Sequence, residues 1–168
     1  MGYGSRTARF VIKKMETDAE IKGKAYVHRK AWQETYTGLI DRRYLDAMTL
    51  EKYERLAYRW RENVLIAKEG ERVIGFCSYG KCRDDDLPDA GEITAIYVLA
   101  AYHGTGAGRA LMEAGLGELD YPRTAVWVLR ENGRAVRFYE KLGFRFEGSE
   151  KEITLGTPVT ERRMILQR

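Results

Sequence analysis

Three glycines ahead of a helix give the sequence its clearest chemical signal. Gly104, Gly106 and Gly108 stand between a β-branched strand, residues 92–98, and a helix that we expect to end near Leu119. Glycine lets backbone amides approach a ligand closely, and the first amides of a helix lack partners and lie at the positive end of its dipole. A pyrophosphate can therefore accept hydrogen bonds from several of these amides together, without a metal ion.

Two other phosphate-binding motifs do not fit this loop. A Walker A motif places Lys and then Ser or Thr after its last glycine, but Arg109 and Ala110 follow Gly108. A Rossmann fingerprint needs a glycine three places after its second glycine, and the corresponding positions hold Arg109 or Leu111. The loop therefore indicates neither a Walker-type ATP site nor a dinucleotide-binding fold.

A second block, Asn132 to Phe144, follows a strand-like run at residues 124–129. It has the pattern of a short helix that begins at Asn132 and stops at Gly143. Together, the loop Tyr-His-Gly-x-Gly-x-Gly and the block Asn-x-x-Ala-x-x-Phe-Tyr-x-x-x-Gly-Phe resemble the GNAT superfamily of acetyl-CoA-dependent N-acetyltransferases. The resemblance covers residues 74–146 best. One difference is His103, where the family usually has Arg or Gln, although an imidazole can still donate to a phosphate.

The resemblance implies an α/β (α+β) fold with a mixed, mostly antiparallel central sheet flanked by helices. Its fourth and fifth strands, residues 92–98 and 124–129, would be parallel and splayed, with the pantetheine of acetyl-CoA in the gap like an added strand. The pyrophosphate would lie on the glycine loop, and Asn132 would contact the cofactor from the other side or only cap its helix. The implied cofactor-binding residues are Ile96, Tyr97, Val98, His103, Gly104, Thr105, Gly106, Ala107, Gly108, Arg109 and Asn132.

The reaction implied by the resemblance is attack of a neutral amine on a thioester, with a thiolate leaving. Most primary amines are protonated at neutral pH, so a base, or a water chain leading to one, must remove a proton first. Glu92 matches a carboxylate used by some members, although a solvated carboxylate at the start of a strand is an equal alternative. Tyr139 matches the family's tyrosine, and a phenol with an ordinary pKa of about 10 can donate to the departing sulfur, unless it is a plain core residue. The Val98 amide would polarise the thioester carbonyl.

The sequence gives the least information on how the acceptor amine is recognised. The family builds its acceptor pocket from the amino-terminal helices and their connecting loop, which here points to Glu34 and Tyr36. Residues 37–40 and Trp32 are also pocket candidates, but Trp32 lies on the apolar face of the first expected helix, which favours the core. His28 fits a surface or core histidine better than a catalytic base. An aromatic wall and carboxylates suit a cationic amine, and the acidic run at residues 84–89 adds attraction if it borders the site. A small-molecule amine and a peptide terminus both remain open as acceptors.

Composition favours one compact enzyme domain spanning residues 1–168. With 44% hydrophobic and 32% charged residues, the chain can bury one sizeable core. The net charge is only +4, and the basic residues are scattered among 25 acidic ones, which argues against a nucleic-acid partner. Cys77 and Cys82 indicate neither a disulfide framework nor a metal site, so we expect free thiols in the cytoplasm. No apolar run approaches membrane-spanning length, and we expect neither a membrane partner nor a secretory signal.

Hydrophobic periodicity predicts the elements that position these residues. Strands are expected at residues 9–13, 64–67, 73–79, 92–98, 124–129, 144–153 and 160–166, and the first helices at 21–33 and 45–60, with a polar loop at 81–91. The alternative to an enzyme is a non-catalytic acyl-CoA-binding or regulatory domain of the same fold, against which Tyr139 argues. Edge strands and exposed aromatic residues also permit a homodimer.

Overall fold

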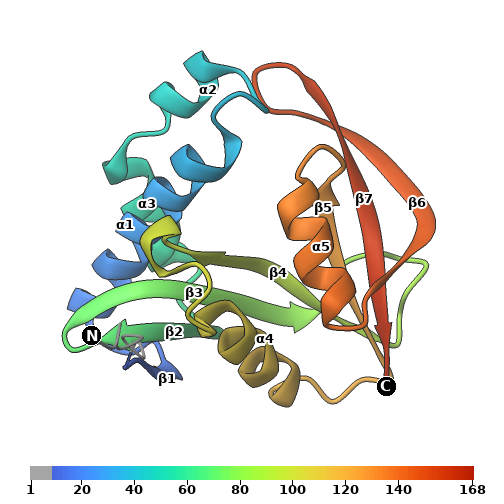
Figure 1. Cartoon of the computed structure of the whole chain (residues 1–168), viewed down its shortest axis with the longest axis horizontal. Coiled ribbons are helices and arrows are strands. Elements are labelled where there is room, and N and C mark those ends of the chain that lie inside the picture. Colours follow the sequence, from blue (N-terminus) through green and yellow to red (C-terminus); the bar gives the residue numbers. More distant parts are fainter. Residues whose placement is uncertain (1–8) are drawn as a thin grey trace, which may run out of the picture.

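Within residues 9–168, the part that this computed structural model describes, the chain forms one sheet of seven strands. In chain order, the strands are β1 (Val11–Lys14), β2 (Val64–Glu69), β3 (Arg72–Lys81), β4 (Ala90–Val98), β5 (Arg123–Leu129), β6 (Arg145–Thr154) and β7 (Pro158–Gln167). The helices are α1 (Asp18–Tyr36), α2 (Arg42–Ala47), α3 (Leu50–Arg59), η1 (Ala100–Tyr102, a 3-10 turn), α4 (Ala107–Gly117) and α5 (Gly133–Lys141). Across the sheet the strand order is β1-β2-β3-β4-β5-β7-β6 (Figure 1).

The first helices differ most from their predicted bounds. α1 starts earlier than predicted because Thr17 and Glu20 form a capping box, in which each side chain accepts from the other's backbone N–H. The single helix predicted over residues 45–60 is wrong. It is two helices, α2 and α3, because Thr49 begins a new helix and its hydroxyl accepts from the N–H of Lys52.

The sheet opens between β4 and β5, which are its one parallel pair among the described strands. They pair only at Ala90, Gly91 and Glu92 of β4. Beyond Glu92, β4 stays paired with β3 as far as Val98, while β5 stays paired with β7 as far as Leu129. In Figure 1, β2 to β4 run across the picture while β5 and β7 run steeply, so the two halves diverge. The predicted mixed sheet with splayed parallel strands, flanked by helices, is confirmed.

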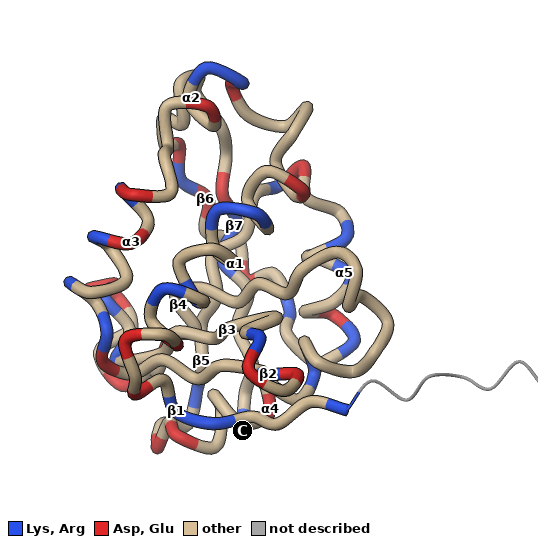
Figure 2. The backbone as a smooth tube through the Cα atoms, turned by 90° about the vertical axis from the view of Figure 1, so that its left-hand side faces the viewer, with Lys and Arg blue, Asp and Glu red and all other residues tan. Residues whose placement is uncertain are grey.

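Helices pack on both faces of this sheet, and each face has its own core. On one side, which we call the α1–α3 face, Ala25, Ala57 and Phe76 are buried together. On the other, the α4–α5 face, Leu111 and Tyr139 pack with the strand residues. Figure 2 views the α1–α3 side and shows charges of both signs interspersed along the chain. The gap where β4 and β5 diverge, which we call the splay, therefore has a layer of helices on either face.

Candidate active site

The glycine loop ahead of α4 contains two left-handed residues. Gly104 has a φ of +79° and Gly106 a φ of +89°, a conformation that residues with side chains rarely adopt. Within residues 9–168, the amides of Gly104, Gly106, Gly108 and Arg109 form no hydrogen bond to a protein acceptor. Thr105 steadies the turn by donating its hydroxyl hydrogen to the Tyr102 carbonyl. The loop thus presents several unpaired amides at a helix start, the arrangement that binds anions.

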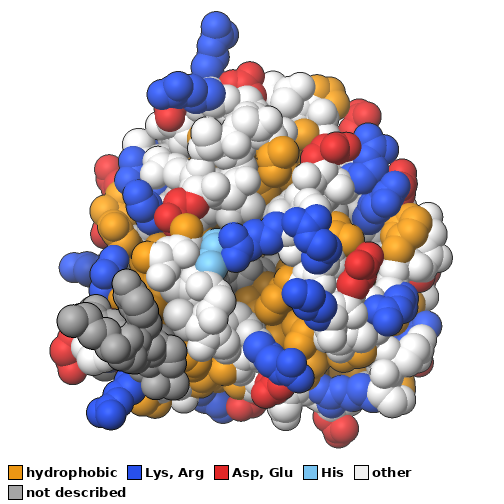
Figure 3. Space-filling model, in the orientation of Figure 1, with side chains coloured by type: hydrophobic (Ala, Val, Ile, Leu, Met, Phe, Trp, Pro, Cys, Tyr) orange, Lys and Arg blue, Asp and Glu red, His pale blue; other side chains and the backbone are white. Residues whose placement is uncertain are grey.

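Gly108 has a different role from the other two glycines. A β-carbon at Gly108 would lie 3.3 Å from the ring of Phe138 on α5. The missing side chain therefore lets α4 and α5 approach each other closely. Figure 3 shows a hollow near the centre of this side of the molecule, with several Lys and Arg side chains around it.

His103 turns back toward the end of β4. Its Nε2 atom lies 3.0 Å from the carbonyl oxygen of Val98, at the end of the strand segment that has separated from β5. We expected the backbone near Tyr97 and Val98 to be available to a ligand, but this carbonyl already has a partner. A ligand that paired with it would require the imidazole to turn away.

Tyr139 is a buried phenol with no hydrogen-bond partner among the described residues. Its side chain is 8% exposed, and its ring packs against Phe138 and Phe144 at centroid distances of 5.5 and 5.7 Å. Burial first, and then the neighbouring Tyr36 and Cys77, raise the pKa of Tyr139 far above its ordinary value. The hydroxyl therefore keeps its proton, and no residue within 9–168 accepts a hydrogen bond from it.

Tyr36 and Tyr97 form a pair of phenols in the clusters on the other face of the sheet. Their hydroxyl oxygens are 2.8 Å apart, so one donates to the other. Burial raises the pKa of Tyr97 well above its ordinary value, and nearby Tyr36 and Tyr139 add to the increase. Tyr139 lies on α5, Tyr36 on α1 and Tyr97 on β4. Burial keeps the hydroxyls of all three residues neutral.

Glu92 lies at the last pair between β4 and β5. It is 2% exposed, so the alternative of a solvated carboxylate is wrong. Arg83 donates to it from its backbone N–H at 3.2 Å and from its guanidinium at 2.8 Å. Both carboxylate oxygens therefore have a partner, and the side chain is positioned at the apex of the splay.

Glu34 and Asn132 both make backbone contacts. The carboxylate of Glu34 accepts from the N–H of Ala100 at 3.1 Å and so ties the end of α1 to η1. The side-chain oxygen of Asn132 accepts from the N–H of Ala135 at 3.2 Å, which is the helix-capping role that we gave as its alternative. The amide nitrogen of Asn132 has no partner among the described residues.

The acidic run before β4 is a loop, as predicted, and its carboxylates have structural partners. Asp84 and Asp86 bind the guanidinium of Arg163 on β7, which is 3% exposed. Asp84 also accepts from the indole N–H of Trp127 at 2.9 Å. Because this network is already paired, it contributes little attraction to an incoming amine.

His28 lies in a cage of aromatic rings between α1, α3 and the sheet. The rings of Tyr53, Phe76 and Trp32 lie 4.7, 5.3 and 5.9 Å from its own, centroid to centroid. Burial, helped by the charge of Lys24, lowers the pKa of His28 to about 3, so the imidazole is neutral. The residue is packed, but its Nδ1 has no partner among residues 9–168.

Sequence reasoning missed Glu161. This residue lies on β7, opposite Leu129 of β5 and Lys151 of β6. Burial first, and then the negative charge of Glu92, raise the pKa of Glu161, while Lys151 and Arg83 oppose the increase. Nothing in the sequence distinguishes this glutamate from others in the last two strands, since its place depends on a register formed between distant segments.

Two hollows in the described surface lie away from these residues. One, of about 810 Å³, is lined by the connection between α1 and α2, and the other, of about 640 Å³, by β6, β7 and the acidic loop. Neither includes the glycine loop or Tyr139. Within residues 9–168 no group of three His, Cys, Asp or Glu residues is placed to hold a metal, and no helix is long and apolar enough to cross a membrane.

Comparison with known proteins agrees with this geometry. The model of the "Acetyltransferase (GNAT) family" matches residues 26–144. The chain belongs to the GNAT family. The resemblance seen in the sequence is thus confirmed, and the protein is an acyltransferase of this family.

Relatives and solved structures cover nearly the whole chain. The uncharacterized N-acetyltransferase YuaI of Bacillus subtilis is 31% identical over 153 residues, which are 83% of this chain and 88% of YuaI. The crystal structure of PaiA N-acetyltransferase from Thermoplasma acidophilum in complex with coenzyme A has a TM-score of 0.72 at 20% identity, covering 95% of this chain and 99% of that one. YncA of Salmonella typhimurium, solved with acetyl-CoA, has a TM-score of 0.65 at 20% identity over 94% and 93% of the two chains. These structures support the GNAT fold.

Proposed function

We propose that this GNAT protein transfers the acetyl group of acetyl-CoA directly to a primary amine of a small molecule or a peptide. The observation that carries the proposal is Tyr139, a residue that is 8% exposed and whose neutral hydroxyl has no acceptor among the described residues. A proton held there, without a competing acceptor, suits a group that donates to a leaving thiolate. The coenzyme A and acetyl-CoA bound by PaiA and YncA are consistent with this co-substrate.

The residues present fit acetyl-CoA. The unpaired amides of Gly104, Gly106, Gly108 and Arg109 suit a pyrophosphate, and Ile96, Tyr97 and Val98 of β4 are no longer paired with β5 and suit the pantetheine. Thr105 and Ala107 would complete the loop, and His103 would release the Val98 carbonyl and turn to the phosphates. Asn132 retains its amide nitrogen for the cofactor. Bound acetyl-CoA supplies the thioester that carries the acyl group.

The chain's own residues divide the proton transfers between them. Tyr139 holds a proton near the position of the leaving sulfur. Glu92 is our proposed base, directly or through water, because it is fixed at the apex of the splay by Arg83. The amide of Val98 would polarise the thioester carbonyl. Glu34 and Tyr36 are the proposed acceptor-side residues, and Tyr36 is the better supported of the two because its hydroxyl meets Tyr97.

The test is release of free thiol from acetyl-CoA by the purified protein, with polyamines, amino acids, aminoglycosides and short peptides as acceptors. Release with one class establishes the transferase and identifies its acceptor. Calorimetry of acetyl-CoA binding runs in parallel. Tight binding of acetyl-CoA with no release across all classes would instead favour a non-catalytic acyl-CoA-binding domain and overturn the proposal.

We also propose a single catalytic domain over residues 1–168 that acts in the cytoplasm without a metal and without a nucleic-acid or membrane partner. Cys77 and Cys82 are buried free thiols, which supports a reducing compartment. A homodimer is compatible with the edge strands β1 and β6. Gel filtration with light scattering measures the oligomeric state directly.

A further inference from the structure

Glu161 is a half-buried carboxylate that forms no hydrogen bond and no ion pair within residues 9–168. Its place is set by the register of β7, where it stands opposite Leu129, the last paired residue of β5. Leu129 packs with Tyr36 and Tyr97 in one buried cluster. Burial first, and to a smaller extent the charge of Glu161, raise the pKa of Tyr36, while its hydrogen bond with Tyr97 opposes the increase.

The two cations whose charges lower the pKa of Glu161, Lys151 and Arg83, have other partners. The ammonium of Lys151, its neighbour across the β6–β7 pair, lies 4.0 Å from the centre of the Trp127 ring. The guanidinium of Arg83 lies 2.8 Å from Glu92. Glu161 is therefore different from Glu92, because its oxygens remain available to a ligand.

A second unpaired polar group lies on the α4–α5 face. Tyr139 is 8% exposed and packs in the core of that face, and no described residue accepts a hydrogen bond from its hydroxyl.

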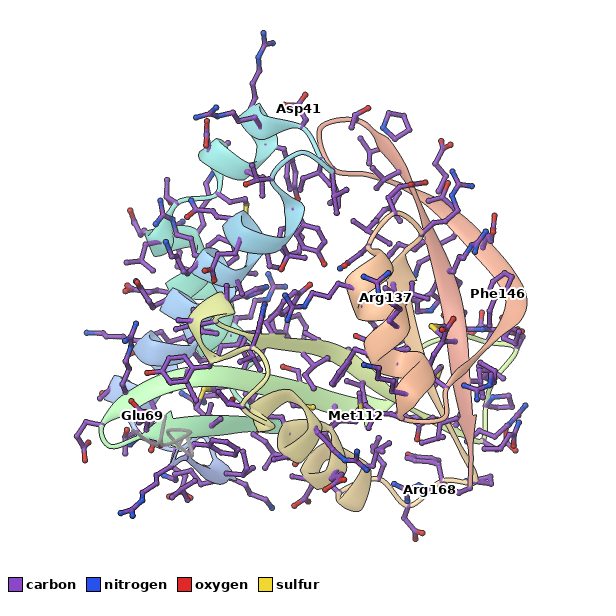
Figure 4. All side chains as sticks on the ribbon, in the orientation of Figure 1. Asp41, Glu69, Met112, Arg137, Phe146 and Arg168 are labelled. Atoms are coloured by element: carbon purple, nitrogen blue, oxygen red, sulfur yellow. The ribbon has the colours of Figure 1, made fainter. Side chains whose placement is uncertain are left out.

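Aromatic rings pack around Tyr36, and the turn between β6 and β7 packs on α2. The rings of Trp32 and Tyr36 are 4.8 Å apart, and those of Tyr36 and Tyr97 are 6.4 Å apart, centroid to centroid. The turn between β6 and β7 packs on the start of α2, since a β-carbon at Gly156 would lie 2.6 Å from Cβ of Asp41 (Figure 4). Figure 4 also shows Arg137 projecting from α5, on the other side of the sheet.

We propose that Glu161 is the specificity-determining carboxylate of the acceptor site, where it binds the protonated form of a cationic aliphatic or arylalkyl amine. The proposal rests on the proposed acetyl transfer, which makes this amine the acceptor. An unpaired carboxylate beside aromatic rings attracts an ammonium, and it repels an acceptor that carries a carboxylate next to its amine. The acceptor class is therefore amines without an adjacent carboxylate, rather than free amino acids.

The test is calorimetry on the full chain loaded with coenzyme A, using matched pairs that differ by one carboxylate. The pairs are 1,4-diaminobutane with ornithine and tyramine with tyrosine. We expect the wild type to prefer at least one amine to its amino acid by tenfold or more, and Glu161→Gln to weaken binding of that amine by about 10-fold to 100-fold, as for hydrogen bonds to charged groups. Glu152→Gln, an exposed glutamate on β6, is the matched control and should bind like the wild type.

The pH dependence separates a binding role from a structural one. The titratable groups that act on Glu161 or on which it acts are Glu92, Arg83, Lys151 and Tyr36. Because the pKa of Glu161 is raised from 4.5, wild-type affinity for the amine should fall on acidification toward pH 5. The affinity of Glu161→Gln should stay flatter.

The outcomes of the binding and thiol-release experiments distinguish this inference from the proposed function. Equal amine affinity in the wild type and Glu161→Gln, or no preference for any amine over its amino acid, overturns the role of Glu161 even if thiol release shows acetyl transfer. Loss of amine binding in Glu161→Gln without any thiol release from the wild type would retain the cationic site and overturn the transferase.

Discussion

The proposed sites on the two faces of the splay differ in construction, because one consists of backbone groups and the other of side chains. On the α4–α5 face, the proposed phosphate site consists of backbone amides around Gly104 and Gly106, held by turn geometry. On the α1–α3 face, the proposed acceptor site consists of the side chains of Tyr36, Tyr97 and Glu161, from α1, β4 and β7. A backbone site of this kind is encoded in a few consecutive residues, whereas a side-chain site is assembled from segments far apart in the chain.

In the proposed reaction, Tyr139 donates a proton to the thiolate that leaves when the acetyl group passes between the two sites. Removing its hydroxyl should therefore have the largest effect. In Tyr139→Phe we expect kcat to fall by about 10²-fold or more, the size of a lost general acid, with the KM for acetyl-CoA within about twofold. The ring stays in place, so packing against Phe144 is kept. Steady-state kinetics measures both constants.

The control for Tyr139→Phe is Tyr26→Phe, which removes a phenol from a residue that is 43% exposed on α1. It should leave kcat unchanged. Unchanged turnover in Tyr139→Phe would mean that Tyr139 is only a core aromatic, and the two faces would then have no chemical group in common.

Glu20 sharpens the comparison because it is a buried carboxylate with a purely structural role. Burial alone would raise its pKa, but hydrogen bonds from Lys13, the N–H groups of Thr17 and Glu16, and Lys68 lower it to about 2. A lowered pKa contributes stability that is present above the unfolded value of about 4.3 and is lost as the pH falls through the folded value. Glu20→Gln should therefore lower the free energy of unfolding at pH 7 by about 2 kcal/mol, a figure reduced for the solvent screening of Lys13.

Urea unfolding across pH checks this prediction. The difference between the wild type and Glu20→Gln should shrink as the pH falls from about 4.5 toward 2. Glu16→Gln, an exposed neighbour whose side chain makes no ion pair among the described residues, is the control and should change stability little. A pH-independent difference would show that hydrogen-bond geometry, rather than charge, holds this end of α1.

Gly106→Ala tests whether backbone conformation dominates the α4–α5 face. A β-carbon at Gly106 meets no atom within 4 Å, so the expected cost comes from its φ of +89°. That conformation costs a residue with a side chain roughly 1–2 kcal/mol, which shifts the loop away from its anion-binding form. We expect acetyl-CoA affinity to fall by about tenfold, measured by calorimetry.

Gly117→Ala is the matched control for the loop variant. Gly117 is the last residue of α4, has no positive φ, and a β-carbon there also meets open space. Because alanine favours helices, this variant should keep acetyl-CoA affinity and hold or slightly raise stability. Equal losses of affinity in both variants would indicate a general effect on α4 rather than on the loop.

The sequence predicted the backbone side of the site better than the side-chain side. The strand, glycine loop and helix around Gly104 and Gly106 form as expected, because the information is local. The break between α2 and α3 was missed, since the cap at Thr49 lies inside an apolar pattern that continues through both helices. Glu161 was missed because its position depends on the pairing of β7 with β5, which no local pattern encodes.

The smallest expected effect is the change in the free energy of unfolding of Glu161→Gln. Its sign is opposite to that of the change expected for Glu20→Gln. A carboxyl whose folded pKa is raised contributes stability that is fully present below its unfolded pKa and is lost as the pH rises through the folded pKa. Removing the charge removes this loss, so at pH 7 Glu161→Gln should be as stable as the wild type or more stable by less than about 1 kcal/mol.

Thermal unfolding at pH 4 and pH 7 measures this difference, which should be near zero at pH 4. A variant that gains stability at pH 7 while losing amine affinity would show that Glu161 is kept unpaired for binding at a cost to the fold. A loss of stability at pH 7 would mean that Glu161 has a structural partner in solution, and the α1–α3 face would then resemble the paired carboxylates of Glu20 and Glu92.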